Sequence, residues 1–269
     1  LPLHYPDGAH DAESLLVDAA RIGPSLGVHH DVVSFLPWKD ALIPRLQAAG
    51  ADVEIVAAHS SAGVLAAVDR LAAVLRRRRP DVVHAHLPIA GVVARVACAL
   101  TKTPGVYTEH NVLERYHPLT LALSLSTWTL QKAVVACSGE VAASIARNVK
   151  RGPRCVVVQN GINADRFEFD ADDADAVAEV AACRASLGFA KDAVVIGTIA
   201  VQRTQKALDR WLEIAAAVHR HRPQTRFVLV GDGPLRAQLE TQSRALGLDG
   251  VVVFAGLQKE PRPYLWAMD

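Results

Sequence analysis

Short runs of apolar, mostly β-branched residues recur along the whole chain, with segments of helical spacing between them. The runs are continuous rather than alternating apolar and polar, which is typical of strands buried on both faces. Each run is bounded by polar residues, glycine or proline, as strands are. We expect strands at 31–36, 52–57, 81–86, 105–108, 133–137, 154–158, 193–199, 225–230 and 250–254.

Apolar positions with a helical period fill the intervals between these runs. The period is clear in four segments, at 62–79, 89–100, 119–132 and 208–221. Buried strands that alternate with helices indicate a parallel sheet covered on both faces, which is the doubly wound α/β architecture.

The alternation stops once, between residues 160 and 191, where the chain is first turn-like, then acidic, then helical. We place a domain boundary here, with an N-terminal Rossmann-like domain at 1–160 and a C-terminal one at 161–269. Six of the expected strands fall in the first and three in the second. Two such domains with facing sheet ends would form a ligand-binding cleft.

Composition narrows the range of functions. The 269 residues carry a formal net charge of only +1, so the chain lacks the basic field of a nucleic-acid-binding protein. Its four cysteines form no CxxC pair, which predicts reduced thiols in a cytoplasmic protein. No apolar run reaches the roughly 18 residues of a membrane span. The uncharged segment 118–131 is too short to cross a bilayer but could lie against one.

The turn after the expected strand at 193–199 carries two cations. The segment "GTIAVQRTQKALD" contains Arg203 and Lys206, and no carboxylate precedes Asp209. A helix that starts at such a turn offers N–H groups and a positive dipole to an anion, and the two cations add to both. The turn therefore predicts a site for a phosphate-bearing ligand.

A second turn, "GDGP", follows the strand at 225–230. Gly231 and Gly233 permit positive φ and close approach of a ligand, and proline suits the first turn of a helix. A dinucleotide fingerprint needs a third glycine where Arg236 stands. By itself the turn is an ordinary tight connection.

Three further groups of polar residues raise questions of chemistry. His84 and His86 share one face of a strand end, although two further metal ligands at useful spacing are not visible. Glu109, His110 and Asn111 follow the next strand, where they would face the cleft. The arginine run 76–79 closes a helix, either as a solvated helix end or as a surface for a membrane or an acceptor.

Together these segments resemble the retaining glycosyltransferases of family 4, which have the GT-B fold of two Rossmann-like domains and use nucleotide-activated sugars. Each match is weak alone, but the matches run in order along most of the chain. They are "PDGAHDAESLLVDAA", "DVVHAH", "YTEHN", "ACSGEVAASI", "VVVQNGINADRF", "IGTIAVQRTQKALDRWLEIAAAV", "FVLVGDGPLRAQLE" and "VVFAGLQKEPRPYLWAMD".

The resemblance implies roles for the residues already singled out. Lys206 falls on the family's lysine that binds the donor diphosphate, and Arg203 would replace an arginine that the family has two residues earlier, at Val201. His110 matches a histidine near the donor sugar and is the expected catalytic residue. Loops around the donor cleft would contain Gly8, Asn160, Gly161, Gly231 and Gly233.

The resemblance also implies the reaction. A sugar would pass from a nucleoside diphosphate sugar to the hydroxyl of a saccharide or lipid-linked acceptor, with retained configuration, in polysaccharide or glycolipid synthesis. We expect no metal and no cofactor beyond the donor. The expected location is the cytoplasm, with peripheral contact at the inner face of the membrane as a further option.

Three departures leave other functions open. Ala207 replaces a glycine of the family, no glutamate pair with the family's E-x₇-E spacing is present, and the chain begins after the family's first strand. We therefore expect a fragment with an incomplete C-terminal domain, which could be inactive. The alternatives are a nucleotide-sugar epimerase of the same fold, whose product is free sugar, and a non-catalytic nucleotide-sugar-binding module.

Overall fold

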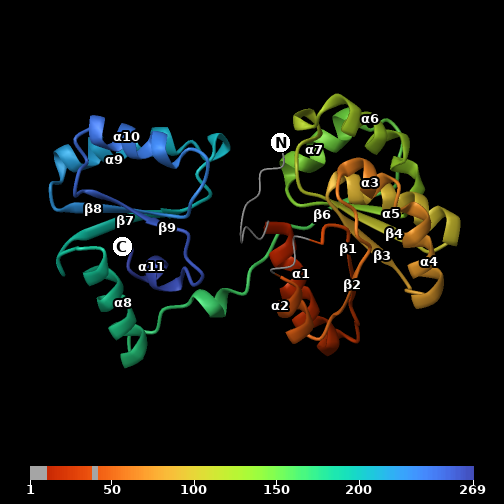
Figure 1. Cartoon of the computed structure of the whole chain (residues 1–269), viewed down its shortest axis with the longest axis horizontal. Helices are drawn as coiled ribbons and strands as arrows, with labels where there is room; N and C mark the ends of the chain where they lie inside the picture. The colour runs from red at the N-terminus through yellow and green to blue at the C-terminus, as the bar shows by residue number, and fades with distance from the viewer. Residues whose placement is uncertain (1–10, 38–41) are drawn as a thin grey trace. The chain divides into compact units, whose positions relative to one another are not determined.

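The computed structural model describes residues 11–37 and 42–269, and it divides the chain into two compact units, residues 1–163 and 164–269. All the strands pair in parallel with their neighbours, and both units are Rossmann-like (Figure 1). The doubly wound α/β fold expected from the continuous apolar runs is confirmed.

All nine expected strands are present, each within a few residues of its predicted bounds. They are β1 (Asp31–Ser34), β2 (Asp52–Ile55), β3 (Val83–His86), β4 (Gly105–Glu109), β5 (Ala133–Ala136), β6 (Cys155–Val157), β7 (Val194–Ile199), β8 (Thr225–Val230) and β9 (Val252–Gly256).

Helices connect these strands. The α-helices are α1 (Asp11–Ile22), α2 (Ile43–Ala48), α3 (Ser61–Leu65), α4 (Val68–Arg78), α5 (Pro88–Thr101), α6 (Pro118–Ser126), α7 (Gly139–Asn148), α8 (Ala174–Ser186), α9 (Leu208–His221), α10 (Arg236–Ala245) and α11 (Arg262–Trp266). Short 3₁₀ turns are η1 (Gly23–Leu26), η2 (Leu113–Arg115), η3 (Trp128–Leu130), η4 (Ala164–Phe167) and η5 (Thr204–Lys206).

The strands of the first unit form two sheets instead of the one expected. In the part of the chain that the structure describes, β1 pairs with β2, and β3 to β6 form a separate sheet in sequence order. Val33 and Phe35, which lie in and just after β1, still pack against the core that Ala85 of β3 and Val93 of α5 share. The two sheets therefore share apolar packing without sharing hydrogen bonds.

Two expected helices are also divided. The helical pattern at 62–79 forms α3 and α4, with a break at Ala66 and Ala67, and the pattern at 119–132 forms α6 and η3. Ala67 is fully buried at the break. Neither break has a glycine or proline, so tertiary packing rather than a local breaker sets these ends.

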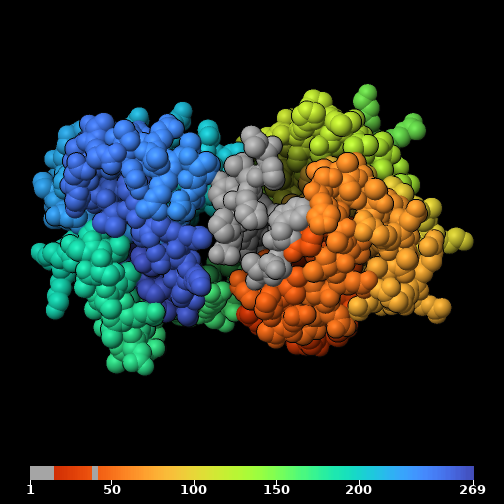
Figure 2. Space-filling view, viewed as in Figure 1, coloured from red at the N-terminus to blue at the C-terminus, as the bar shows by residue number. Residues whose placement is uncertain are grey.

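In the second unit, consecutive residues of β8 serve two different cores. Phe227 and Leu229 pack against Leu212 of α9 and Leu239 of α10, whereas Val228 and Val230 pack against Phe189 and Tyr264 on the other face. This is the period-two alternation of a strand covered on both sides. Figure 1 shows α9 and α10 on one face of the sheet and α8 and α11 on the other, and Figure 2 shows the same view filled by side chains.

Candidate functional site

Three histidines meet at the carboxyl ends of β3 and β4, and we call them the histidine edge (His84, His86 and His110). The parallel register sets His86 opposite Thr108, two residues before His110. Nδ1 of His86 lies 3.0 Å from Nε2 of His110, and Nε2 of His84 lies 2.6 Å from the Thr108 hydroxyl. One ring nitrogen of each histidine is thus in contact with a neighbouring side chain.

His86 is held neutral by its surroundings. Burial, and then the charges of His84 and His110, lower its pKa to about 3. Its Nε2 atom is buried and has no hydrogen-bond partner among the residues that the structure describes. A buried N–H without an acceptor is rarer and less favourable than an unpaired acceptor. The proton of His86 therefore belongs on Nδ1, where it donates to Nε2 of His110.

Glu109 corrects an expectation, because it is fully buried and does not face a cleft. Its carboxylate accepts hydrogen bonds from the backbone N–H groups of His110 (3.0 Å) and Asn111 (3.1 Å). It also accepts from the hydroxyls of Tyr107 (3.3 Å) and Tyr116. Burial raises the pKa of Glu109, and these bonds oppose the shift. The side chain thus holds the backbone that carries His110.

A buried cation lies beside this carboxylate. Arg95 is almost fully buried and places its guanidinium carbon 4.5 Å from the ring centroid of Tyr107 and 5.0 Å from that of Trp128. It donates to the side chain of Gln131 at 2.8 Å. No sequence pattern pointed to Arg95, since it falls within an apolar helical segment.

In the second unit, hydrogen bonds of Gln202 connect the loop that follows β7 to the loop that follows β8. Gln202 is fully buried, donates its backbone N–H to the Asp232 carbonyl (2.9 Å) and accepts from the Leu235 N–H (3.1 Å). Its side-chain amide donates to the Gly231 carbonyl at 2.8 Å. The sequence reading missed Gln202, because a glutamine between a strand and a basic turn looks like an exposed loop residue.

The two glycines of the second turn serve this junction. Gly231 has φ +118°, and a Cβ there would lie 2.2 Å from the Ala200 carbonyl oxygen. A Cβ on Gly233 would lie 2.5 Å from the Gln202 carbonyl oxygen. Both positions need glycine because the other loop's backbone passes so close, and only Gly231 has the positive φ expected for the pair.

The junction presents cations of two kinds. Arg203 and Lys206 have no ion-pair partner in the described part of the chain, and Nε of Arg203 is buried without a hydrogen bond. Arg236, by contrast, is paired with Asp232 (3.2 Å) and Glu240 (2.8 Å). The loop 200–206, which we call the basic loop, is therefore the part of this junction whose charge is available to a ligand.

The start of α9 is less regular than expected. Lys206 lies in η5 rather than in α9, and the N–H groups of Lys206 and Ala207 are bonded to the carbonyls of Arg203 and Thr204. Ala207 precedes α9 with φ +47° and ψ +41° and supplies no side-chain cap. The anion site expected here consequently rests on the two side chains and on the first N–H groups of α9.

The remaining predicted residues do not join either group. Asn160 and Gly161 are exposed in the segment between β6 and η4, and a Cβ on Gly161 would touch nothing within 4 Å. Gly8 lies outside the described residues.

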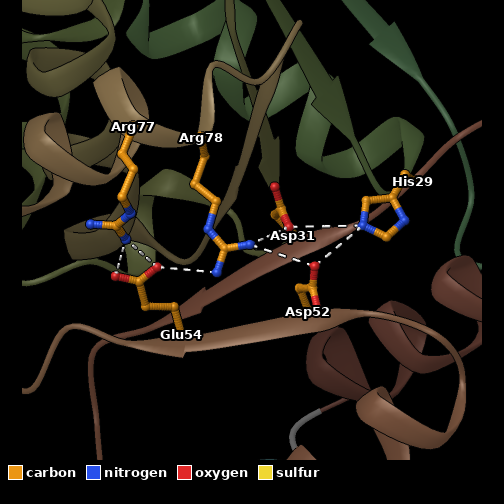
Figure 3. Close-up of polar contacts among 6 residues, drawn as sticks. All are labelled: His29, Asp31, Asp52, Glu54, Arg77 and Arg78. Carbon is orange, nitrogen blue, oxygen red and sulfur yellow. Dashed lines mark hydrogen bonds and ion pairs between the residues drawn. The ribbon is translucent and has the colours of Figure 1, made fainter.

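An exposed polar cluster lies at the amino ends of β1 and β2 (Figure 3). His29, Asp31 and Asp52 bring together three potential metal ligands. Arg78, however, contacts the Asp31 carboxylate at 3.0 Å and that of Asp52 at 3.5 Å. The cluster is an ion-pair network that joins α4 to this small sheet.

The sequence matches two family models in turn. Glycosyltransferase Family 4 matches residues 12–166, more than half of the chain, and Glycosyl transferases group 1 matches residues 190–269. The chain therefore belongs to Glycosyltransferase Family 4.

Individual proteins are similar over different lengths. Anabaena Alr3699/HepE, solved in complex with UDP-glucose, superposes with a TM-score of 0.77 at 21% identity, covering 99% of this chain and 71% of that one. The UDP-GlcNAc 2-epimerase of Neisseria meningitidis gives a TM-score of 0.60 at 14% identity, covering 94% and 72%. The Vi polysaccharide biosynthesis protein VipC/TviE of Salmonella typhi is 39% identical over 59 residues, which is 22% of this chain and only 10% of that protein.

Both structural likenesses fall at identities where only the fold is shared, and the fold is that of the GT-B glycosyltransferases. Within the described residues, none of the helices is both long and apolar enough to cross a membrane.

Proposed function

We propose that the chain takes part in transferring a glycosyl group from a nucleoside diphosphate sugar to an acceptor hydroxyl. The bond between the anomeric carbon and the diphosphate oxygen breaks, and a bond to the acceptor oxygen forms. The diphosphate leaves with the electron pair, and the acceptor hydroxyl loses its proton. We propose retention of configuration and a role in polysaccharide or glycolipid synthesis.

The observation that carries this proposal is the basic loop. Arg203 and Lys206 lie at the carboxyl end of β7, where open parallel sheets bind ligands, and no carboxylate of the described residues pairs with them. Two cations at this place stabilise the charge that grows on a departing diphosphate. They would supply the charge that a divalent metal supplies in other transferases, so we propose no metal.

The roles of the two units follow. The second unit would hold the donor, and UDP is the first nucleotide to test because Alr3699/HepE is described as a complex with UDP-glucose. The first unit would hold the saccharide or lipid-linked acceptor, with His110 beside the donor sugar. Family membership and the partial match to a polysaccharide biosynthesis protein support this assignment.

Calorimetric titration of the chain with UDP, and an assay of sugar transfer, test the proposal. Lys206→Ala should weaken UDP binding and lower turnover about a hundredfold, on the order of 3 kcal/mol, as loss of one transition-state donor does. Lys206→Arg should retain more activity than Lys206→Met. Lys191→Ala removes an equally exposed lysine of the same unit and is the control. Unchanged binding and turnover in Lys206→Ala would contradict the phosphate role.

The second candidate is a nucleotide-sugar epimerase, which the structural likeness to the Neisseria enzyme favours. The product distinguishes the two functions, since an epimerase forms an epimeric sugar without an acceptor, either still on the nucleotide or freed by water, and a transferase needs the acceptor to form a glycoside.

A further inference from the structure

A basic hollow lies at the opposite ends of β3 and β4 from the histidine edge. Its volume is about 440 Å³, and it opens between the C-terminal ends of α4 and α5. Pro80 and Pro104, which precede β3 and β4, form part of its wall, and the Val83 N–H donates to the Pro104 carbonyl at 2.9 Å. The hollow therefore lies at the amino ends of these strands.

The arginine run 76–79 divides between two environments. Arg77 donates to the Glu54 carboxylate at 2.6 Å, and Arg78 contacts the carboxylates of Asp31 and Asp52 (Figure 3). Arg76 and Arg79 line the hollow instead. The inner two arginines are thus neutralised by β1 and β2, and the outer two are not.

Lys102 adds a third cation to the hollow. The other lining residues are neutral, namely Leu75, Thr101, Thr103 and the two prolines. Arg76, Arg79 and Lys102 are all exposed, and none has an ion-pair partner in the part of the chain that the structure describes. The three like charges around the hollow repel one another, and an anion bound among them would offset this repulsion.

The helix ends alone do not require this arrangement. Cations are favoured near helix C-termini, which accounts for Arg76. Arg79 and Lys102, however, are the residues that directly follow α4 and α5, and both have the left-handed conformation, with φ +49° and +58°. Glycine or asparagine is the usual residue there. Two helices that pack on each other are thus each followed by a long cation, and both cations line the same hollow.

We propose that this basic hollow binds a phosphate-bearing anion through Arg76, Arg79 and Lys102. The site is separate from the basic loop, which belongs to the other unit, and from the histidine edge, which lies at the other ends of β3 and β4. Its ligand is a free phosphate or diphosphate compound or the headgroup of an anionic phospholipid. The two sources share the same group and differ in whether a membrane is present.

The test uses pyrophosphate as the soluble probe, and phosphatidylcholine vesicles with and without phosphatidic acid as the membrane probe. The background is the whole chain carrying both Arg203→Ala and Lys206→Ala, which removes the two cations of the basic loop from pyrophosphate binding. Arg76→Gln, Arg79→Asn and Lys102→Asn are introduced together. Asparagine tolerates the left-handed conformation, so the helix ends should stay intact.

Calorimetry should show that the parent binds pyrophosphate. Each single substitution should weaken this binding about fivefold, which is the upper range for an exposed charge pair. The triple variant should not bind pyrophosphate. If the ligand is a lipid headgroup, the parent chain should co-sediment with vesicles that contain phosphatidic acid, and the triple variant should not. Neither protein should co-sediment with vesicles of phosphatidylcholine alone.

A matched control removes three exposed cations elsewhere on the same unit, with Lys150→Gln, Arg151→Gln and Arg154→Gln together. It changes the net charge equally and should keep binding to whichever probe the chain binds. Arg76→Gln alone leaves the two left-handed residues, Arg79 and Lys102, unchanged. It therefore tests the site even if the triple variant fails to fold. The proposal is overturned if Arg76→Gln and the triple variant bind both probes as the parent does, or if the control loses binding equally.

Discussion

The histidine edge and the basic loop are built in different ways, although both lie where parallel strands end. At the histidine edge, side chains hold the backbone, because the buried carboxylate of Glu109 accepts the N–H groups of His110 and Asn111. At the basic loop, backbone meets backbone, and Gly231 and Gly233 allow the contact by having no Cβ.

The difference bears on how each region can work. The interior bonds of the histidine edge fix the backbone that carries His110, and such preorganisation suits the catalytic role that we propose for this residue. The basic loop is held at Gln202 by hydrogen bonds, but Arg203 and Lys206 have no ion-pair partner among the residues that the structure describes, and their side chains can adjust to an anion. The histidine edge thus fixes the position of one residue, whereas the basic loop presents positive charge on movable side chains.

The largest effect should come from removing the support of the histidine edge. Glu109→Ala leaves two N–H groups and two tyrosine hydroxyls without their acceptor and the buried Arg95 without a nearby negative charge. Such losses cost on the order of 4 kcal/mol. Urea unfolding of the chain measures the change. Glu109→Gln keeps one oxygen for the N–H groups and should lose clearly less, so equal losses would mean that hydrogen bonding contributes little.

The corresponding change in the second unit is Gly231→Ala. A methyl group there would meet the Ala200 carbonyl oxygen at 2.2 Å in a backbone conformation with φ +118°. Overpacking and strain together should cost about 3 kcal/mol in the free energy of unfolding. Gly247→Ala is the matched control, since Gly247 also has a positive φ (+71°) but open space around its Cα. A similar loss in both variants would show that strain, and not the contact between loops, requires glycine.

The histidine edge should also make stability depend on pH. The pKa of His86 is lowered from 6.5 to about 3 in the folded chain, so the unfolded chain takes up a proton first as the pH falls. Stability contributed by neutral His86 is therefore complete above the unfolded pKa and is lost as the pH falls from 6.5 toward 3. At about pH 4.5, two pH units below the unfolded pKa, the loss should be on the order of 3 kcal/mol.

His86→Asn removes this titration and keeps a donor for Nε2 of His110. Denaturant unfolding at neutral pH and at about pH 4.5 should show a smaller loss of stability for the variant than for the parent. Parallel losses in the two proteins would mean that His86 titrates normally and is not held neutral by its surroundings.

The positions of the strands could be predicted from sequence because burial on both faces leaves a continuous apolar run. Val228 and Val230 face one core and Phe227 and Leu229 the other, so all four positions must be apolar. The separation of β1 and β2 from β3 could not be predicted, since the apolar runs on the two sides look alike and pairing depends on contacts far apart in the chain.

The candidate sites were predictable only in part. Histidines at strand ends and two cations on a turn stand out in a sequence. The structure places both groups at or just after the carboxyl ends of strands, as expected. Gln202 and Arg95 do not stand out, because polar residues are usually exposed and only the fold shows that these two are buried. The hydrogen-bond partners of Glu109 could not be predicted for the same reason.

The smallest effect concerns Ala207, which links the basic loop to α9 where the family resemblance implies glycine. Its φ of +47° places an alanine in the left-handed region, which costs a residue with a Cβ on the order of 1 kcal/mol relative to glycine. Ala207→Gly should therefore stabilise the chain by up to about 1 kcal/mol, offset in part by the greater freedom of glycine in the unfolded chain. Ala237→Gly, at an exposed position in the first turn of α10, should instead destabilise, by less than the roughly 1 kcal/mol that glycine costs in a helix interior. Thermal unfolding of both variants should thus give shifts of opposite sign. If Ala207→Gly lowers the melting temperature as Ala237→Gly does, the backbone at residue 207 is not left-handed in the folded chain, and Lys206 is held differently from the arrangement on which the proposed donor site depends.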